Sequence, residues 1–416
     1  MTVETNTTTT THAPRVADTG AAALDALLER TVANRDLPAV TFGVIGASGA
    51  PIYFAARGEK ALGDAAKGQI DETTYLELYS QTKLMVAVAV LQLVDRGVLN
   101  LDDTAVVEKH APELLAQKVL SYDDAGNEVL SPLTGKLTLR TLLTHTSGLA
   151  YGFDSPALAK WEAAHKPATS YNPESGVAGF TRPFVFQPGT NWTYSIGIDW
   201  AGIILERVTG QSLEEYFTQH IFAPLGLKDL TFYITEANAP RFQVVQTRTE
   251  SGWEPAKFSY RDRTPGVRYK QLSGGGGLVG TAKDYLLFLQ AILAAKEHSN
   301  AVVSKAAYDE LFRDSLTADV RAKLNARPDK ALKQIPGGPA ALSWSVGLEL
   351  NLTDGEFGRK KGSGYWGGAA KTSFWLDPAS GIAAVFGTQI LGAAFADLGF
   401  KAVKDEFERT LYDALE

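Results

Sequence analysis

The sequence predicts an α/β fold of the α+β type, with one antiparallel sheet built from both ends of the chain and a mainly helical part inserted between them. Three observations predict this fold: strand-like segments near the N-terminus, a long middle part dominated by helical patterns, and a return of strand-like segments before the C-terminus. The predicted boundaries are a disordered tail at 1–17, a sheet domain formed by 18–75 together with 271–416, and a mainly helical domain at 76–270.

The N-terminal part is predicted to hold a tail, a helix and a hairpin. The first residues are polar and rich in threonine, which is typical of disorder and lacks the basic and apolar regions of a secretory signal. Leucines then recur at helical spacing over 20–34. Apolar runs at 39–45 and 51–56 are separated by a turn-forming segment at 46–50, which predicts a β-hairpin.

The C-terminal part is predicted to supply the remaining strands and a closing helix. Strand patterns run over Ser343–Leu350, Gly368–Leu376 and Ile382–Thr388, and an amphipathic helix follows from about 395 to 415. A terminal helix at each end of the chain would pack on the sheet. The cleft between the sheet and the inserted helical part is the natural place for a site.

Composition excludes several classes of function. The chain has 416 residues, of which 45% are hydrophobic and 21% charged, as is ordinary for a soluble globular protein. A net charge of -7 without a basic cluster argues against a nucleic-acid partner. The absence of cysteine excludes disulfides and thiolate ligands, and the six histidines are scattered without metal-ligand spacing. We therefore expect no metal, no cofactor and, since no apolar stretch reaches about 18 residues, no membrane span. A cytoplasmic location is expected.

The stretch Ser80-Gln81-Thr82-Lys83 carries the most chemical information. It is the only Ser-x-x-Lys in the chain, and it precedes an apolar helix that should end at a glycine cap, Gly97. Ser80 and Lys83 would share one face of the first helical turn. Apolar surroundings and the helix dipole disfavour the ammonium form of Lys83, and a neutral amine can accept the proton of a serine hydroxyl. Taken alone, the motif also fits a solvated helix start.

Two further segments could complete such a site. A Pro-Gly turn delivers Tyr194 onto a loop before a helix, and a tyrosine near a neutral lysine can act as general base and then acid. The glycine-rich segment 361–369 lies at the start of a C-terminal strand, where a backbone N–H could join that of Ser80 in holding an oxyanion. Each segment also has a plain structural interpretation, as a core tyrosine and a glycine turn. His145 is interpreted as a loop histidine bonded to backbone rather than as the partner of a serine, and no Gly-x-Ser-x-Gly occurs.

Further motifs follow in a fixed order along the chain. They are Ser80–Lys83, Gly97–Asp103, Leu137–Leu149, Pro188–Thr190, Tyr194–Ser195, Gly274–Leu278 and Thr281–Asp284. Together they resemble the class C β-lactamase-like serine enzymes, a superfamily that includes penicillin-binding proteins, family VIII carboxylesterases and the acyltransferases of fungal lovastatin biosynthesis. The resemblance covers nearly the whole chain from about residue 20. The likeness to the lovastatin-pathway acyltransferases rests on Tyr122–Asn127, on Thr144–Leu149 with Tyr151 following, and on Asp199–Gly202.

The resemblance implies a role for each matching residue. It makes Ser80 the nucleophile and the pair Lys83 and Tyr194 the general base. It also implies an oxyanion hole formed by the backbone N–H groups of Ser80 and Ala369. The large flat side chains among the implied cleft residues suit an apolar acyl or aromatic group. The implied substrate-binding residues are Tyr151, Trp366, Gly367 and Gly368.

Two departures from the family pattern narrow the activity. In the segment Tyr194–Ile196 the last residue is not the Asn that ends the tyrosine motif of β-lactamases. The segment Trp366–Gly368 replaces their Lys-Thr-Gly, so the cation that would hold a β-lactam carboxylate is missing. Family VIII esterases share the Trp-Gly-Gly replacement, and an apolar Trp favours neutral or hydrophobic esters.

The function predicted from these residues is a serine carboxylic ester hydrolase that forms an acyl-enzyme on Ser80 and acts on small or hydrophobic esters. The alternative is an acyltransferase that uses the same intermediate to move an acyl group from a thioester or ester to a bulky alcohol. A β-lactamase or D-alanyl peptidase is a third hypothesis, and a binding protein with a silent site is a fourth. The expected partner is therefore a small-molecule ester or thioester and, for a transferase, an alcohol acceptor.

Overall fold

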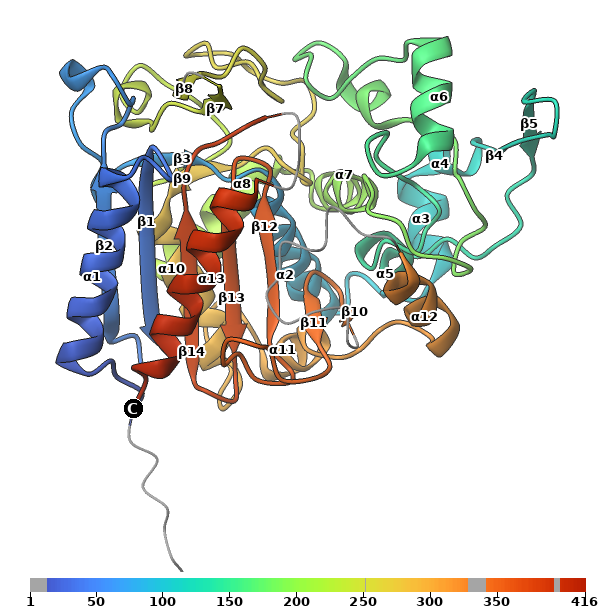
Figure 1. The fold of residues 1–416 in the computed structure, drawn as a ribbon. Helices are drawn as coiled ribbons and strands as arrows, with labels where there is room; N and C mark the ends of the chain where they lie inside the picture. The colour runs from blue at the N-terminus through green and yellow to red at the C-terminus, as the bar shows by residue number, and fades with distance from the viewer. Residues whose placement is uncertain (1–12, 251, 328–341, 393–396) are drawn as a thin grey trace, which may run out of the picture.

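The computed structural model describes residues 13–250, 252–327, 342–392 and 397–416, and its centre is an antiparallel sheet of seven strands. These strands are β1 (Ala39–Gly46), β2 (Pro51–Gly58), β10 (Leu342–Trp344), β11 (Glu349–Asn351), β12 (Gly364–Gly368), β13 (Thr372–Asp377) and β14 (Ile382–Gly387). Their order is β10-β11-β12-β13-β14-β1-β2, so β1 lies between β14 and β2. The prediction of one sheet built from both chain ends is therefore confirmed (Figure 1).

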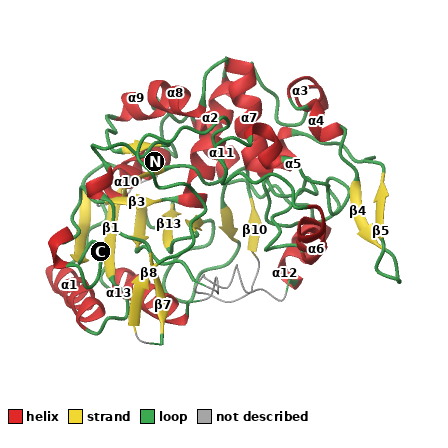
Figure 2. Cartoon of the chain, turned by 90° about the horizontal axis from the view of Figure 1, so that it is seen from above, coloured by secondary structure: helices red, strands yellow, loops and turns green. Residues whose placement is uncertain are grey.

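Helices cover both faces of this sheet (Figure 2). The terminal helices α1 (Asp18–Ala33) and α13 (Leu398–Asp413) lie on one face, and α10 (Ala282–Ala294) and α2 (Thr82–Asp95) lie on the other. Alternating strand residues fill the two cores: Phe42 and Trp375 face α1 and α13, whereas Phe374 packs on the side of α2 and α10. Burial along its whole length explains why β1 is almost wholly apolar.

The segment between β2 and β10 holds most of the helices and three small sheets. Its remaining helices are α3 (Thr104–His110), α4 (Pro112–Leu115), α5 (Leu139–Leu143), α6 (Pro156–His165), α7 (Gly197–Thr209), α8 (Leu213–Phe217), α9 (Ala223–Leu225), α11 (Lys305–Leu311) and α12 (Ala318–Ala326). Its short strands are β3 (Tyr75–Glu77), β4 (Val119–Tyr122), β5 (Glu128–Ser131), β6 (Leu230–Thr231), β7 (Gln246–Thr249), β8 (Gly252–Pro255) and β9 (Val279–Thr281). The sequence did not predict these strands, because segments of two to four residues carry no periodic pattern.

The domain boundaries at 75/76 and 270/271 stay a prediction. Strand β3 lies at the first predicted boundary and pairs with β9, which follows the second predicted boundary. Strand β6 pairs with the other side of β9. Residues 1–12 of the predicted tail lie outside the described residues. From Val16 onward the N-terminal end is paired with the chain's other end, because Val16 bridges to Leu415 and the N–H of Arg15 donates to the carbonyl of Glu416 at 3.1 Å.

Two C-terminal strand predictions were wrong in their bounds. The run Ser343–Leu350 is a hairpin, β10 and β11, whose turn contains Gly347 at φ 132°, a backbone conformation open to glycine. The predicted strand Gly368–Leu376 begins instead at Thr372, because the chain turns back after β12 with Lys371 at φ 65°. The predicted strand at Ile382–Thr388 is confirmed as β14, and the closing helix is confirmed as α13, although residues 395 and 396 lie outside the described part.

Helix α2 is buried from Thr82 to Leu93, which fits its almost wholly apolar sequence. It ends as predicted: Gly97 adopts φ 69°, and its N–H donates to the carbonyl of Val94 at 2.9 Å. The charged side chain of Lys83 lies inside this apolar environment, where an isolated ammonium is costly. The helix therefore places a single reactive amine in the core, one turn from the nucleophile predicted by the sequence.

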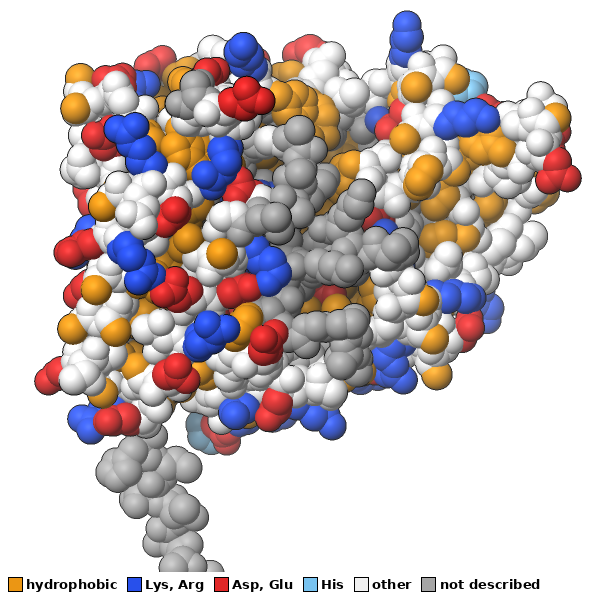
Figure 3. All heavy atoms as spheres, in the orientation of Figure 1, with side chains coloured by type: hydrophobic (Ala, Val, Ile, Leu, Met, Phe, Trp, Pro, Cys, Tyr) orange, Lys and Arg blue, Asp and Glu red, His pale blue; other side chains and the backbone are white. Residues whose placement is uncertain are grey.

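The surface over α1 and α13 is polar and mixed in charge. Figure 3 shows lysine and arginine side chains interspersed with aspartate and glutamate on this face. Within the described ranges, no helix has both the length and the apolar character that crossing a bilayer requires.

Candidate active site

A cavity of about 580 Å³ brings the predicted site residues together from distant parts of the chain. Lys83 lies beneath it and is only 1% exposed. The structure thus brings together the residues that the sequence predicted for the site, while the chemical role of each stays a prediction. The predicted residues that line the cavity are Ser80, Tyr151, Tyr194, Trp366, Gly367, Gly368 and Ala369.

Ser80 lies in a tight turn, Tyr79–Gln81, that leads directly into α2. Tyr79, the residue before Ser80, has φ 45°, a left-handed conformation that is costly for a bulky side chain. Polar contacts hold this conformation, because the hydroxyl of Tyr79 donates to Glu77, and Glu77 also pairs with Arg263. The turn that presents Ser80 to the cavity is therefore strained at Tyr79 and held in place by the contacts of Glu77.

Lys83 donates to three uncharged acceptors. Its Nζ lies 3.2 Å from Ser80 Oγ, 3.0 Å from the Tyr151 hydroxyl oxygen and 2.6 Å from the carbonyl oxygen of Gly275. Burial lowers the pKa of Lys83 to about 7, an effect opposed by the negative charge of Asp199. Because the pKa lies near neutral, a large fraction of this amine is free to accept a proton at physiological pH.

Tyr194 is buried and hydrogen-bonded to both Ser80 and Trp366. Its hydroxyl oxygen accepts a hydrogen bond from Trp366 Nε1 at 3.1 Å and is also hydrogen-bonded to Ser80. Lys83 Nζ lies 4.7 Å from the centre of the Tyr194 ring. Burial raises the pKa of Tyr194 above its ordinary value, and the hydrogen bonds from Ser80 and Trp366 oppose that rise. Tyr194 is therefore a neutral phenol at physiological pH.

The loop that carries Tyr194 is fixed by a buried carboxylate. Asp154 accepts the backbone N–H of Tyr194 at 2.8 Å and the hydroxyl of Thr193 at 2.5 Å. Its other oxygen pairs with Arg327 at 2.7 Å. In addition, the N–H of Tyr151 donates to the carbonyl of Tyr194 at 3.1 Å. These bonds hold the two tyrosines in a fixed relation.

His145 is a structural histidine, as the sequence predicted. Its Nδ1 accepts the backbone N–H of Ser195 at 3.2 Å and lies 2.9 Å from the Ser195 hydroxyl. The ring is fully buried 4.8 Å from the rings of Tyr194 and Trp344, and burial lowers its pKa well below the ordinary value. A neutral imidazole in this position supports the Tyr194 loop and does not contact Ser80.

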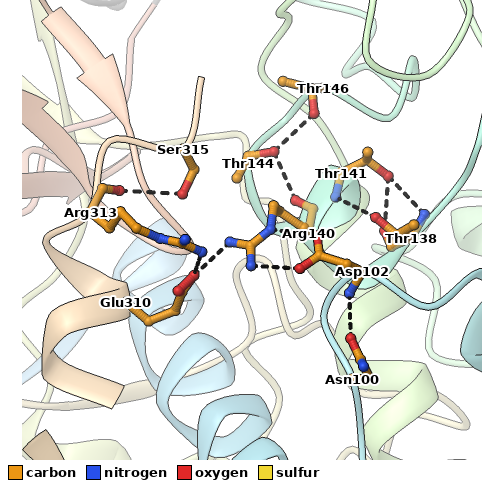
Figure 4. A network of polar contacts seen from close by, with 10 residues as sticks. All are labelled: Asn100, Asp102, Thr138, Arg140, Thr141, Thr144, Thr146, Glu310, Arg313 and Ser315. Carbon is orange, nitrogen blue, oxygen red and sulfur yellow. Dashed lines mark hydrogen bonds and ion pairs between the residues drawn. The ribbon is translucent and has the colours of Figure 1, made fainter. Parts of the chain in front are cut away.

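The segment around His145 is anchored through Arg140 (Figure 4). Arg140 donates to both carboxylate oxygens of Asp102 at 2.6 and 2.8 Å and to Glu310 at 2.6 Å. Thr144 bonds back to the carbonyl of Arg140 at 2.8 Å and to the hydroxyl of Thr146 at 2.9 Å. The network ties α5 to α11 and keeps the loop that follows α5 in place beneath the site.

Glycines let β12 approach the nucleophile turn closely. A Cβ on Gly368 would lie 2.3 Å from the carbonyl oxygen of Leu78, which no side chain tolerates. This contact places the end of β12 against the turn that carries Ser80, and Ala369 is the next residue after it. The arrangement suits the predicted oxyanion hole, in which the N–H groups of Ser80 and Ala369 act together.

The sequence reasoning named Asp199 only within a family motif and assigned it no role in the site. Asp199 lies in the first turn of α7, is 2% exposed, and accepts hydrogen bonds from the hydroxyl of Ser273 at 2.6 Å, the N–H of Gly275 at 2.8 Å and the hydroxyl of Tyr151 at 3.2 Å. A signal was present, since Asp199 is the only charged residue in the apolar run Gly197–Leu205. Tyr151, expected only to line an acyl cleft, lines the cavity and also links Lys83 to this carboxylate.

Aromatic side chains surround the entrance of the cavity. Phe153 stacks on Tyr151 with ring centres 4.9 Å apart and is 49% exposed. On another side, exposed Tyr171 and Phe258 pack against Tyr260. Partly exposed aromatic rings at an entrance favour an apolar ligand. Across the described ranges, no group of three or more His, Asp or Glu side chains is arranged to hold a metal ion.

Comparison with known proteins identifies the family. The sequence model of the Beta-lactamase family matches residues 24–405, and the chain belongs to this family. It is 31% identical over 381 residues to the lovastatin esterase of Penicillium rubens, an alignment that covers 88% of this chain and 92% of that protein. It is 33% identical over 326 residues to the monacolin J acid methylbutanoyltransferase of Aspergillus terreus, covering 76% of each.

Solved structures agree with this assignment. A mutant simvastatin synthase from Aspergillus terreus has a TM-score of 0.82 at 29% identity, covering 95% of both chains. A hydrolase with promiscuous acyltransferase activity shares the fold, with a TM-score of 0.73 at 19% identity. The expected β-lactamase-like fold and superfamily are therefore confirmed. The protein is an ester hydrolase or acyltransferase of the β-lactamase fold.

Proposed function

We propose that the protein is a serine carboxylic ester hydrolase that forms an acyl-enzyme on Ser80, with Lys83 and Tyr194 moving the proton. The observation that carries the proposal is the position of Lys83, a buried amine whose Nζ lies 3.2 Å from Ser80 Oγ beneath the cavity. A serine hydroxyl is a weak nucleophile until a neighbouring base accepts its proton. Few side chains can act as that base at neutral pH, and a buried lysine is one of them.

The pKa values decide which partner accepts the proton. Burial brings the pKa of Lys83 to about 7, whereas the pKa of Tyr194 stays above its ordinary value of 10. Near pH 7 about half of the Lys83 side chains are therefore neutral, and nearly every Tyr194 is protonated. Lys83 is accordingly the base for Ser80, and Tyr194 is the acid for the leaving group.

The reaction then proceeds in two steps, acylation of Ser80 and hydrolysis of the acyl-enzyme. Ser80 Oγ bonds to the carbonyl carbon while its proton passes to Lys83, and the N–H groups of Ser80 and Ala369 stabilise the resulting oxyanion. When the bond to the leaving alkoxide breaks, Tyr194 donates its proton to that oxygen and is reprotonated by Lys83. In the second step water attacks the acyl carbon, and the same proton transfers run in reverse order. The acid and the free serine are then released.

The cavity supports small or hydrophobic esters as substrates. Trp366 lies where the β-lactamase pattern has a lysine, so the indole offers an apolar surface and one N–H in place of a cation. The exposed aromatic entrance adds apolar surface. The names of the relatives, a lovastatin esterase and a monacolin J acid methylbutanoyltransferase, support an ester whose alcohol part is bulky. A β-lactam carboxylate gains nothing from Trp366, and absence of nitrocefin turnover is expected.

A second candidate is an acyltransferase that delivers the same acyl group from an ester or thioester to a bulky alcohol. It is favoured by the large aromatic side chains that line the cavity beside Ser80, among them Tyr151 and Trp366, which suit a bulky apolar ligand. The chemistry up to the acyl-enzyme is shared, and the two activities differ only in whether water or the alcohol reaches the acyl carbon.

Product analysis tests the proposal and separates the two candidates. Wild type and Ser80→Ala are incubated with p-nitrophenyl butyrate, with and without a bulky alicyclic alcohol, and the products are identified by mass spectrometry. We expect p-nitrophenol release by wild type only, with butyric acid as the main product. A dominant butyryl ester of the added alcohol would establish the transferase instead. Equal turnover by Ser80→Ala would disprove both.

A further inference from the structure

The hydrogen bonds around Lys83 fix the direction of its lone pair. A neutral amine has two N–H groups and one lone pair in a tetrahedral arrangement. The carbonyl of Gly275 at 2.6 Å can only accept, so it takes one hydrogen. If the Tyr151 oxygen at 3.0 Å takes the other, the remaining direction points to Ser80 Oγ at 3.2 Å. The amine is then oriented to accept the serine proton.

This arrangement requires Tyr151 to accept from Lys83, and Asp199 makes it do so. The hydroxyl hydrogen of Tyr151 needs an acceptor of its own, and an ionised carboxylate can only accept. Asp199 Oδ2 lies 3.2 Å from that hydroxyl, while Oδ1 is held by Ser273 and by the N–H of Gly275. Gly275 thus bonds to both ends of the chain of contacts, through its N–H to Asp199 and through its carbonyl to Lys83.

We propose that Tyr151 and Asp199 form a positioning pair that aims the lone pair of neutral Lys83 at Ser80 and sets the pH above which the site becomes active. The proposal rests on the proposed function, because it assigns Lys83 as the base. It changes the role of Tyr151 from a wall of the acyl cleft to a positioning residue. It also gives Asp199 a role, acting through Tyr151 and Gly275 without touching the substrate.

The charges around Lys83 support the second part of the proposal. The groups that face it are Asp199, the rings of Tyr151 and Tyr194 at 5.1 and 4.7 Å, and His145, which is neutral because burial lowers its pKa. Among these, Asp199 is the group whose negative charge acts on Lys83. Its negative charge favours the ammonium form of Lys83 and opposes the effect of burial. Removing that charge therefore moves the onset of activity to lower pH.

Two conservative variants break the pair at different points. In Asp199→Asn the new amide N–H₂ donates to Tyr151, so the Tyr151 hydrogen turns toward Lys83 and occupies the lone pair. In Tyr151→Phe the ring stays and the second acceptor is lost. For both we expect kcat to fall about 10- to 100-fold with little change in KM, as for a general base out of position. In Asp199→Asn, which removes the negative charge, we also expect the acid midpoint of the pH profile to fall by about one unit.

The test is the pH dependence of kcat and KM for p-nitrophenyl butyrate hydrolysis in full-length wild type, Asp199→Asn and Tyr151→Phe. Two control variants lie away from the site, and one of them shares a helix with Asp199. Glu206→Gln removes a carboxylate on α7 that accepts the N–H of Leu213, and Tyr216→Phe removes a buried hydroxyl that donates to Gln92 on α2. Both controls should change stability without moving the acid midpoint.

The outcomes separate this proposal from the function on which it rests. Lower kcat in both site variants, with a lower acid midpoint in Asp199→Asn and neither change in the controls, supports the positioning pair. Site variants with the midpoint and kcat of wild type overturn it, as does a midpoint shift of the same size in the controls. Activity retained by Ser80→Ala overturns the proposed function itself. If Asp199→Asn does not fold by circular dichroism, Tyr151→Phe, which keeps the ring, decides alone.

Discussion

Lys83 and Lys404 are two buried lysines on opposite sides of the sheet, and their partners differ. Lys404 lies on α13, 3.5 Å from Glu408, whose carboxylate also binds Arg359 at 2.6 Å. Lys83 lies on α2 and bonds only to uncharged oxygens. Burial lowers the pKa of both, to about 8 for Lys404, where Glu408 opposes the shift, and to about 7 for Lys83.

The comparison shows that the cost of burying a lysine can lead to a structural role or to a role in proton transfer, depending on the partners of the amine. A buried ammonium next to a carboxylate is a paired charge, and removing its partner leaves a charge without compensation. A buried amine among neutral acceptors keeps a pKa near physiological pH and stays available for proton transfer. The cluster around Lys404 is therefore expected to affect stability, and Lys83 to affect the reaction.

The largest expected effect on activity is that of Lys83→Met. The substitution removes the base, so kcat/KM for p-nitrophenyl butyrate should fall about 10³-fold or more. Replacing a buried amine by an apolar side chain of similar length should leave the melting temperature unchanged or raised. Steady-state kinetics and calorimetry check both parts. Activity within tenfold of wild type would exclude Lys83 as the base.

Glu408→Gln should give the largest loss of stability. The variant leaves Arg359 and Lys404 buried without their carboxylate, which typically costs about 3–5 kcal/mol. Urea unfolding measures this change, and kcat of the folded protein should stay that of wild type. Lys404→Met is the matched control: it should cost less, because the Arg359–Glu408 pair remains. A larger loss in Lys404→Met than in Glu408→Gln would reverse the interpretation of this cluster.

The pH profile tests the pKa of Lys83 directly. Only the neutral amine accepts the serine proton, so kcat/KM should rise about tenfold per pH unit below the pKa and level off above about pH 7. The sign follows from the lowered pKa, since deprotonation is complete at a lower pH than for an exposed lysine. Stopped assays across pH 5–9 measure the midpoint. A midpoint near that of an ordinary lysine would contradict the account.

Trp366→Phe should lower activity far less than Lys83→Met does. It keeps an aromatic ring in the cavity and removes the N–H that donates to the Tyr194 oxygen at 3.1 Å. The loss of one hydrogen bond to a group that passes through a charged state corresponds to about a tenfold fall in kcat. KM should change little if the indole N–H acts on Tyr194 and not on the substrate. A change confined to KM would assign Trp366 to substrate binding alone.

The sequence allowed prediction of the overall sheet and of the residues that meet in the cavity, for physical reasons that differ. The long apolar pattern of α2 and the spacing of Ser80 and Lys83 are local signals, and both are confirmed as structure. The family resemblance supplied Tyr194 and Ala369, which lie far from Ser80 along the chain. The Lys83–Tyr151–Asp199 contacts could not be predicted, because they depend on side-chain directions in three separate segments.

Strand bounds near Gly368 were missed for a related reason. The tight turn at Lys371 contains no Pro-Gly or Asn-Gly signal, so the sequence predicted one continuous strand where the structure has a hairpin. Likewise, the left-handed backbone conformation of Tyr79 could not be predicted from the sequence, because tyrosine does not favour that conformation. Both lie next to the cavity, where tertiary contacts with Glu77 and β13 override local preference.

The central claim is that Ser80 becomes acylated, and intact-protein mass spectrometry tests it most directly. Wild type and Ser80→Ala are exposed briefly to p-nitrophenyl butyrate, quenched in acid, and the acylated peptide is mapped. The account predicts a butyryl adduct on the peptide that contains Ser80 in wild type, and none in Ser80→Ala. An adduct of the same size in both proteins, or one mapped to another residue in wild type, would contradict it.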